Sequence, residues 1–340
     1  MDGTHMARLR VAVLLAVVTG CACLGAEYDQ ATAHALRSLG QPVKHWPKVT
    51  MKGDMAQRSI PEAVAVHKVV PRKFSEATLD RLLKVTELDR SQTFQGADRG
   101  VFGTPGVRYY GSLESNHTLT VIPAQGWIHY TRLEAVDDKG NKTLQGPTEE
   151  ETMRWGLEFA KILDLKESDF ARHPVENRLD YRFLKTEGGP VRLAPRVKSM
   201  EVFFRRAIDG HPVATGRLYG GLWVGYGFHG MLYKFELAAR ATEPMATIKL
   251  APLSEQFQKI TSGRQAHAVR WPVDPEELKT DKDAILELDF VELVYFEDAP
   301  EKFQKIIPPL LRWEGELRFK GDRHLVVLFT PIKQAEANRN

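Results

Sequence analysis

The chain has 340 residues, of which 47 are basic and 44 acidic, and its formal net charge at pH 7 is +3. Because these charges are interleaved and form no basic block, the sequence has no electrostatic footprint for nucleic acid. Its length suffices for one large or two medium domains, and its ordinary apolar content predicts a globular protein rather than a disordered one.

The N-terminal residues have the pattern of a secretory signal. Arg8 and Arg10 supply positive charge, residues 11–18 (VAVLLAVV) form an unbroken apolar run, and small residues follow. The uncharged stretch ends at Glu27 after about 16 residues, which is shorter than the roughly 20 that a membrane-spanning helix needs. We therefore predict that residues 1–26 are a signal peptide and that the protein is exported to a periplasmic or other extracytoplasmic location.

The cleavage site of this signal has two interpretations. Residues 18–21 (VTGC) resemble a bacterial lipobox, in which the cysteine, here Cys21, becomes lipidated and anchors the protein to a membrane without a spanning segment. The alternative is ordinary cleavage after Ala26, where the large side chain of Leu24 fits poorly. Cys21 and Cys23 are the only cysteines, so the folded part contains no disulfide, thiolate zinc site or thiol nucleophile.

Residues 27–100 form a weakly patterned N-terminal segment. A short helix is expected over residues 27–39, ending at Gly40, and residues 41–54 read as an extended connector broken by prolines. Ser75 is suited to cap a helix over residues 75–88.

Residues 101–177 are expected to form a first unit of strands followed by a helix. Short β-prone runs cover residues 106–114, 117–123 and 126–136, and the last of these alternates in polarity. The strongest helix pattern covers residues 147–165, where Thr148 and Glu151 match a capping box.

Residues 178–335 repeat this order in a second, larger unit. Strands are expected at residues 179–185, 199–208, 212–219, 222–227 and 231–240, with a turn at Asp209-Gly210, and a helix at 254–261 is expected to be capped by Ser254 and stopped by Gly263. After a proline-broken loop at 271–281, three strands close the chain at 284–296, 310–319 and 324–332. The predicted fold class is therefore α+β, with mainly antiparallel sheets that are each followed by a helix.

Residues 225–230 (GYGFHG) have the Gly-x-Gly-x-x-Gly spacing of a dinucleotide-binding loop. Such a loop needs a helix after it, so that backbone N–H groups face the pyrophosphate. The residues that follow, from Met231 onward, alternate with the period of a strand. We therefore predict a hairpin rather than a nucleotide site, and no cofactor.

The remaining chemistry-bearing residues form no recognisable catalytic or metal-binding motif. None of the 11 histidines has a close ligand spacing, and His211, His229 and His267 are expected near turns or loops. No Gly-x-Ser-x-Gly motif is present. Carboxylates such as Asp209, Glu287 and Asp289 cannot be paired from the sequence, so a glycosidase-like pair assembled by the fold stays open. We predict no catalytic, cofactor-binding or metal-binding residue.

Aromatic side chains concentrate on the predicted strands, where core and cross-strand packing are their expected roles. An exposed cluster among them would mark a binding face. The residues concerned are Trp127, Trp223, Tyr226, Phe228, Tyr233 and Phe235.

Residues 200–241 resemble a PepSY-type arrangement, and the chain from about 180 to 332 is similar to cell-envelope regulatory lipoproteins of the YycI and YycH kind. The resemblance rests on a strand, the turn at residues 209–213 (DGHPV), a glycine-containing strand, a return strand and the helix at 254–261. It extends to the closing runs FVELVYF and LLRWEGEL. The resemblance implies PepSY- or cystatin-like units in a non-catalytic module that binds a protein or restrains a protease, and it supplies no site residues.

We therefore expect a secreted or lipid-anchored bacterial envelope protein without enzymatic activity, which binds an envelope protein partner and touches the membrane only through its lipid. Two alternatives stay open. One is a hydrolase of envelope sugars or peptides that uses carboxylates brought together by the fold, and the other is a structural component of the envelope.

Overall fold

The computed structural model describes residues 26–53, 60–93, 107–112, 117–132, 146–172, 179–187, 198–216, 220–227, 230–261, 266–269, 271–299, 302–332 and 334. Cys21 and all of the predicted signal except residue 26 lie outside these residues. The chain divides into two compact units. The terminal unit comprises Met1–Lys68, Pro244–Phe296 and Ile306–Asn340, and the central unit comprises Val69–Glu243 and Glu297–Lys305.

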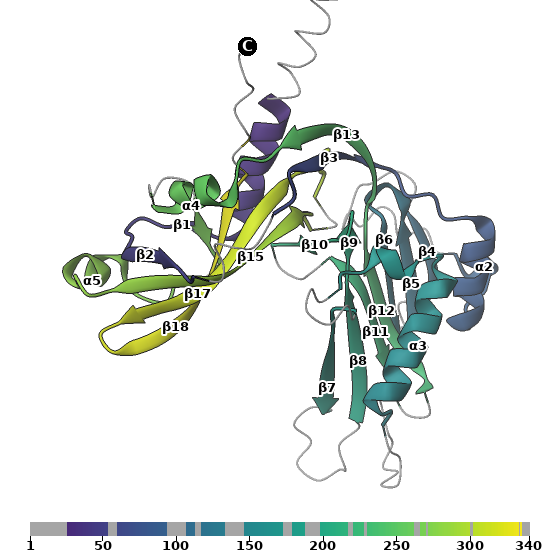
Figure 1. Ribbon diagram of the computed structural model, residues 1–340. Helices are drawn as coiled ribbons and strands as arrows, with labels where there is room; N and C mark the ends of the chain where they lie inside the picture. Colours follow the sequence, from purple (N-terminus) through teal and green to yellow (C-terminus); the bar gives the residue numbers. More distant parts are fainter. Residues whose placement is uncertain are drawn as a thin grey trace, which may run out of the picture. The chain divides into compact units, whose positions relative to one another are not determined.

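The central unit is built on a seven-stranded sheet in the described part of the chain (Figure 1). The strands follow the order β4, β5, β6, β12, β11, β8, β7, and each neighbouring pair is antiparallel. Their bounds are Arg108–Ser112 for β4, His117–Ile122 for β5, Trp127–Arg132 for β6, Tyr181–Glu187 for β7, Lys198–Arg205 for β8, Gly221–Tyr226 for β11 and Leu232–Ala238 for β12.

This sheet corrects the predicted fold class. The pairing of β6 with β12 sets Tyr130 opposite Phe235 and Thr131 opposite Lys234, and so joins the two groups of strands that were expected to form separate units. The predicted boundary near residue 177 therefore falls inside one sheet. Strands dominate the described chain, and the expected α+β, PepSY- or cystatin-like units, each a sheet followed by its own helix, are wrong. The physical reason is that both groups of strands contribute apolar side chains to the same core.

Two helices cover one face of this sheet (Figure 1). α3 spans Glu149–Ile162, and its predicted capping box is confirmed: Glu151 N–H donates to Thr148 Oγ1 over 3.2 Å, while Thr148 N–H donates to the Glu151 carboxylate over 2.9 Å. α2 spans Glu76–Val85 and is capped by Ser75 as predicted, although it ends three residues earlier than the pattern indicated.

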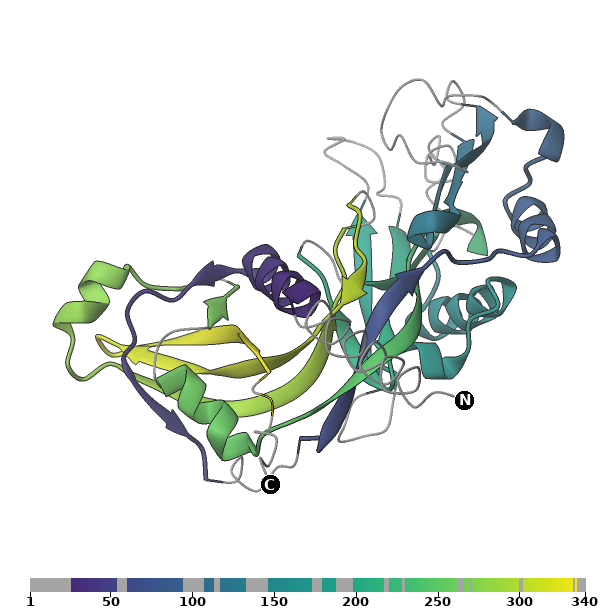
Figure 2. The ribbon, with the colours of Figure 1, turned by 90° about the horizontal axis from the view of Figure 1, so that it is seen from above.

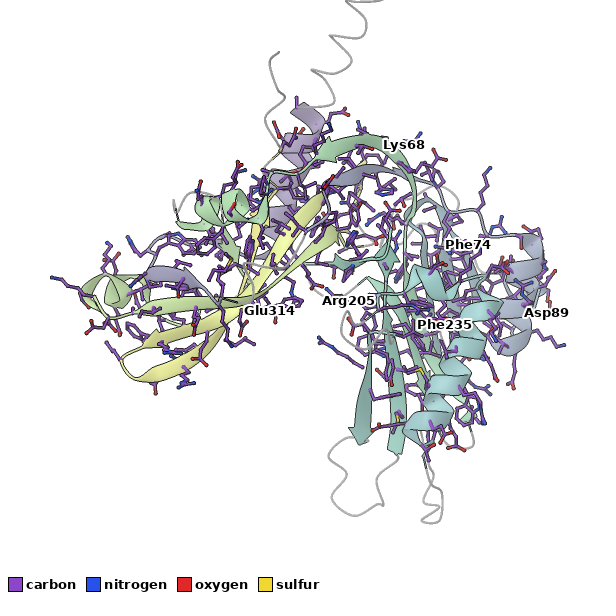
Figure 3. The ribbon with its side chains drawn as sticks, in the orientation of Figure 1. Lys68, Phe74, Asp89, Arg205, Phe235 and Glu314 are labelled. Carbon is purple, nitrogen blue, oxygen red and sulfur yellow. The ribbon has the colours of Figure 1, made fainter. Side chains whose placement is uncertain are left out.

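The core of the central unit lies between these helices and the sheet. The ring of Phe235, labelled in Figure 3, has its centroid 4.5 Å from that of Phe159 on α3 and 5.3 Å from that of Tyr130 on β6. α3 lies close to the sheet at Gly156, where a Cβ atom would lie 2.7 Å from side-chain atoms of Val202 and Phe204. Burying one such large apolar side chain contributes roughly 1.5–3 kcal/mol, so this core fixes α3 against the sheet.

Among the described residues, the central unit also contains a small hairpin and three short helical turns. β9 (Ala207–Ile208) and β10 (His211–Ala214) are antiparallel, and the turn between them has φ of 51° at Asp209 and 78° at Gly210. Two positive φ values in succession are typical of a type I′ hairpin turn, so the predicted turn is confirmed. The 3₁₀ turns are η2 (Arg90–Gln92), η3 (Pro123–Gln125) and η5 (Glu167–Asp169).

The terminal unit is built on the three closing strands, which form as predicted. β15 (Ile285–Phe296), β17 (Pro309–Phe319) and β18 (Asp322–Pro331) are antiparallel neighbours. Beyond β18 the sheet continues with β14 (His267–Ala268) and β1 (Gln41–Pro42), and β2 (Lys48–Met51) runs parallel to β15. The expected extended connector thus supplies two strands.

A separate three-stranded sheet has the order β13, β3, β16. β13 spans Ala241–Lys249, β3 spans Ala63–Val70 and β16 spans Ile306–Ile307. None of these three segments was predicted as a strand.

The helices of the terminal unit depart from the predictions in two places. Residues 26–39 are helical as expected, and Figure 2 shows this helix in purple. α4 spans Leu253–Thr261, so Ser254 lies inside the helix instead of capping it, and Gly263 lies outside the described residues. α5 (Pro275–Thr280) replaces part of the expected loop, because Asp274 caps it by accepting from Glu276 N–H over 2.8 Å. None of the described helices combines the length and apolar character needed to cross a membrane.

Candidate functional site

The Gly-x-Gly-x-x-Gly stretch joins two paired strands. β11 ends at Tyr226 and β12 begins at Leu232, and their antiparallel register shifts next to Gly225. The N–H of Gly227 donates to the carbonyl oxygen of Met231 over 2.9 Å. Residues 228 and 229 lie outside the described residues. Because a strand and not a helix follows Gly230, the helix N-terminus of a dinucleotide loop is missing here, and the predicted hairpin is confirmed.

Packing against aromatic rings accounts for two glycines of this stretch. A Cβ atom at Gly225 would lie 2.8 Å from the Tyr233 ring, and one at Gly230 would lie 2.8 Å from the Trp155 ring. Gly230 also has a φ of 72°, which glycine adopts without strain. Glycine at positions 225 and 230 therefore allows the backbone to lie close to the rings of Tyr233 and Trp155.

The carboxylates considered for catalysis are divided between the two units. Asp209 lies in the β9–β10 turn of the central unit, whereas Glu287 and Asp289 lie on β15 of the terminal unit. Glu287 pairs with Arg318 at 3.1 Å, and Asp289 is exposed at the irregular register of β15.

The best-buried charges of the central unit form a network with a structural role. Glu297 accepts hydrogen bonds from Arg206 and from the backbone N–H of Arg240. The Arg240 guanidinium donates to the carbonyl oxygens of Asp298, at 2.6 Å, and Lys302, at 2.7 Å. Buried charges are stable when they are paired in this way, and the network ties residues 297–299 and 302–305 to the sheet.

The candidate histidines are dispersed. His211 begins β10, His267 lies on β14 with its Nδ1 3.2 Å from the carbonyl oxygen of Gly40, and His229 is outside the described residues. His129 on β6 is buried enough to lower its pKa, with smaller effects from Glu236 and Lys234. Within the part of the chain that the structure describes, no group of three His, Cys, Asp or Glu side chains could hold a metal ion.

The aromatic residues divide between the two faces of the seven-stranded sheet. Tyr226 and Phe235 belong to the core under α3, and Phe228 is outside the described residues. Trp127 and Trp223 belong to the opposite face, because they alternate along their strands with core residues. Tyr233 joins them, because the register shift between β11 and β12 places its ring against Gly225.

The indole and phenol groups of these three aromatic residues are hydrogen-bonded within the sheet. Trp127 Nε1 donates to Glu236 over 3.1 Å, Tyr233 OH donates to Glu201 over 2.6 Å, and Trp223 Nε1 also donates to Glu201. The Lys234 ammonium lies 4.8 Å from the Trp223 ring centroid. These contacts satisfy the indole and phenol groups without a ligand, so the expected cross-strand packing accounts for them.

A groove between α3 and the edge strand β7 is the surface best suited to a partner. We call it the α3–β7 groove. It encloses about 580 Å³, and its apolar walls are Met153, Leu157, Tyr181 and Phe183. The rings of Tyr181 and Phe183 lie edge to face with centroids 5.2 Å apart, and Tyr181 keeps 38% of its surface exposed. Both rings come from alternate positions of β7, so they point to the same side of the strand.

The edge of the sheet borders this groove. β7 pairs with β8 on one side, and in the described sheet no strand lies on its other side. An edge strand presents a row of backbone N–H and C=O groups that can pair with another chain. The groove thus combines apolar walls with backbone hydrogen-bonding groups.

Charged side chains line the rim of the groove. Glu149, Glu150 and Glu158 carry negative charge, whereas Arg154 and Lys161 carry positive charge. All five belong to α3 and to positions beside its apolar stripe. The sequence predicted this helix and its apolar residues, but nothing in the sequence indicated that β7 would be the edge strand of the sheet beside α3.

Comparisons with known proteins leave the family open. No family model and no curated protein matches the chain. Among solved structures, an uncharacterized protein from Eubacterium rectale is similar, with 10% sequence identity and a TM-score of 0.46, over 90% of this chain and 99% of that one. A likeness at this level assigns neither a family nor an activity, and the PepSY-like resemblance stays a prediction that these comparisons do not support.

Proposed function

We propose that the protein is exported and acts without catalysis by binding a protein partner, and that the α3–β7 groove binds an extended segment of that partner. The observation that carries the proposal is the apolar groove beside the open edge of β7. Export rests on the signal pattern of residues 1–26, and Cys21 is the candidate site for a lipid anchor.

The proposed mode of binding is strand addition. An extended segment that pairs with β7 gains main-chain hydrogen bonds, and every second side chain of the segment points toward α3. These side chains would contact Met153, Leu157 and Phe183, which already pack against the core. Since that core holds the groove in place, binding requires little reorganisation of the protein.

The rim charges favour a segment that carries a basic residue. Three glutamates and two basic residues line the groove, which leaves one net negative charge. Two unit charges 4 Å apart in water interact by about 1 kcal/mol, so the rim contributes modestly and its contribution falls with salt. The apolar side chains and the backbone pairing therefore supply most of the expected affinity.

A peptide-display experiment tests this proposal. Random seven-residue peptides are selected on the protein that lacks residues 1–26, and the affinities of enriched peptides are measured by fluorescence anisotropy. Tyr181→Lys and Leu157→Lys should each weaken binding at least tenfold, because each places a charge in the apolar groove. Val85→Lys is the matched control, since Val85 is 37% exposed on α2, nearly the same as Tyr181 at 38%.

Backbone methylation separates strand addition from simple apolar contact. N-methylation at alternate peptide positions should abolish binding, and methylation at the intervening positions should be tolerated, since only every second N–H faces β7. The proposal fails if no peptide is enriched, if the groove variants bind as well as Val85→Lys, or if the methylated positions show no alternation.

A further inference from the structure

The backbone of β7 presents a regular row of hydrogen-bonding groups at the edge of the sheet. The N–H of Arg205 on β8 donates to the carbonyl oxygen of Asp180 over 3.1 Å, so residues at even positions of β7 direct their N–H and C=O groups toward β8. The N–H and C=O groups of Tyr181, Phe183 and every second residue after them therefore face away from β8. β7 contains no proline, and in the described sheet no strand lies on this side of it.

A second copy of β7 that pairs antiparallel with this edge would relate the two chains by a two-fold axis. Such an interface uses the same surface of both copies, so each of its contacts occurs twice. Side chains of directly opposite residues point to the same face of a sheet, and the two α3 helices would therefore lie on one face of a continuous sheet. Because α3 runs roughly along the strands (Figure 1), the two helices would be antiparallel to each other.

The middle of α3 lies beside Phe183. A Cβ atom at Gly156 would lie 2.7 Å from Val202, and Val202 is the residue of β8 that pairs with Phe183. An axis at Phe183 thus relates the middle of one α3 to the middle of the other. The two copies of β8 under these helices would be three strand spacings, or about 14 Å, apart. A helix with its side chains is about 10–12 Å wide, so side chains of the two helices would meet above the paired β7 strands.

The charges along α3 are complementary to a reversed copy of themselves. Arg154 and Glu158 lie two residues on either side of Gly156, so the reversal brings Arg154 of one copy opposite Glu158 of the other. Glu150 lies six residues before Gly156 and Lys161 five residues after it, so these two charges also come together. Opposite charges would therefore meet at four places in the dimer, and complementarity of this kind selects the partner and fixes the register of an interface.

The apolar side chains of the α3–β7 groove would form the centre of this interface. Met153, Leu157 and Phe183 are only partly buried against the core, and Tyr181 is 38% exposed. A second copy contributes the same four side chains, so the apolar walls of both grooves are buried together. Apolar and aromatic residues at the centre with charged residues at the rim are the usual composition of a protein interface.

We propose that the partner of the α3–β7 groove is a second copy of this chain, bound by antiparallel pairing of the two β7 strands around Phe183. This inference rests on the proposed function, because it names the partner that binds the same groove. The dimer removes the open edge of the sheet in both copies, and an open edge can otherwise pair with other extended chains.

Sedimentation velocity of the protein that lacks residues 1–26 tests this proposal, and the parent protein should be a dimer at micromolar concentration. Arg154→Glu and Glu158→Arg should each weaken dimerisation about tenfold, since each variant creates two contacts between like charges. An equimolar mixture of the two variants should dimerise about as tightly as the parent, because both contacts then join opposite charges again. Lys84→Glu reverses an exposed charge on α2 and is the control, which should dimerise like the parent.

Recovery in the mixture separates the interface from folding. Each chain in the mixture still carries its own substitution, so only contacts between the two copies can restore the dimer. A mixture that does not recover overturns the inference. So does a dimer that is insensitive to Tyr181→Lys and to both charge variants, because the two copies would then meet at another surface.

Peptide selection on the Arg154→Glu variant separates this inference from the proposed function, because that variant leaves the groove open to other chains. A parent protein that stays monomeric up to millimolar concentration overturns the dimer. If peptides that bind the groove are still selected, the proposed function stands without it. If the protein is monomeric and no peptide is enriched, both fail.

Discussion

Replacing Gly156 by alanine should destabilise the protein, although the same substitution usually stabilises a helix. The reason is that the added Cβ atom would clash with side chains of the sheet. In the interior of an exposed helix, glycine is less favourable than alanine by about 0.8–1.0 kcal/mol, so the substitution ordinarily stabilises. In α3 the added Cβ would lie 2.7 Å from Val202 Cγ1 and 2.7 Å from Phe204 Cε2. Val202 and Phe204 are both fully buried, with exposures of 0%, so neither side chain has free space to move into.

The expected magnitude follows from these opposing effects. Inserting a methyl group into a packed core typically costs 1–3 kcal/mol, and the helix regains about 1 kcal/mol. The free energy of unfolding should therefore fall by about 1 kcal/mol, and by at most about 2 kcal/mol. The displaced α3 would also move the wall of the α3–β7 groove that carries Met153 and Leu157, so peptide affinity should fall along with stability.

Urea unfolding followed by circular dichroism measures this change. Gly53→Ala is the matched control, because no atom lies within 4 Å of a Cβ at Gly53 and its backbone is not left-handed, so that variant should be neutral or slightly stabilised. Val202→Ala removes one of the two clashing groups, and combining it with Gly156→Ala should destabilise by less than the sum of the single changes. A Gly156→Ala protein more stable than the parent would refute the close packing of α3 on the sheet.

Three further changes probe single interactions. Ser75→Ala should lower the free energy of unfolding, measured in urea, by about 1 kcal/mol. The reason is that the alanine side chain cannot accept the hydrogen bond that Ser75 Oγ accepts from Thr78 N–H over 3.0 Å. Arg240→Met should cost about 3–5 kcal/mol, since it removes the guanidinium that pairs with the buried carboxylate of Glu297 at 3.7 Å and donates to the carbonyl oxygens of Asp298 and Lys302. Limited proteolysis should then cut residues 297–305 faster. Stability should hold up to about pH 10 and then fall until about pH 12, because burial raises the pKa of Tyr28, Tyr130 and Tyr226 and the unfolded chain loses these protons first. Each tyrosine contributes at most about 1.4 kcal/mol per pH unit, so Tyr28→Phe should make the decline in urea titrations shallower by up to that amount.

Local elements were predictable where the sequence carries a local signal. Thr148 and Glu151 specified the start of α3, and Ser75 specified the start of α2, because a cap is a contact between residues three apart. The strand that ends at Tyr226 and the one that begins at Leu232 were predictable from alternation alone. The prediction that Ser254 caps α4 was wrong. Serine is a common capping residue, but α4 begins at Leu253, directly after a proline, so Ser254 lies one position inside the helix.

The pairing of strands that are distant in the sequence could not be predicted from local patterns. The sheet forms because β6 and β12, about a hundred residues apart in the chain, bury side chains in one core, and periodicity describes each strand without naming its neighbour. β13 could not be predicted from a local pattern either, because its side chains are mostly exposed or half-buried and it contains Pro244, a residue that disfavours strands. It is a strand because β3 offers it hydrogen-bonding partners.

The α3–β7 groove is a consequence of such distant pairing, and this explains why the sequence did not reveal it. Met153 and Leu157 are only partly buried against the core, and they line the groove together with side chains of β7, which lies at the end of the described sheet. If an eighth strand lay beside β7, the same residues would be part of the core. Tyr181 is an exposed aromatic residue of the edge strand β7. Its proposed role in binding therefore depends on the order of the strands in the sheet, which the residues next to it in the sequence do not reveal.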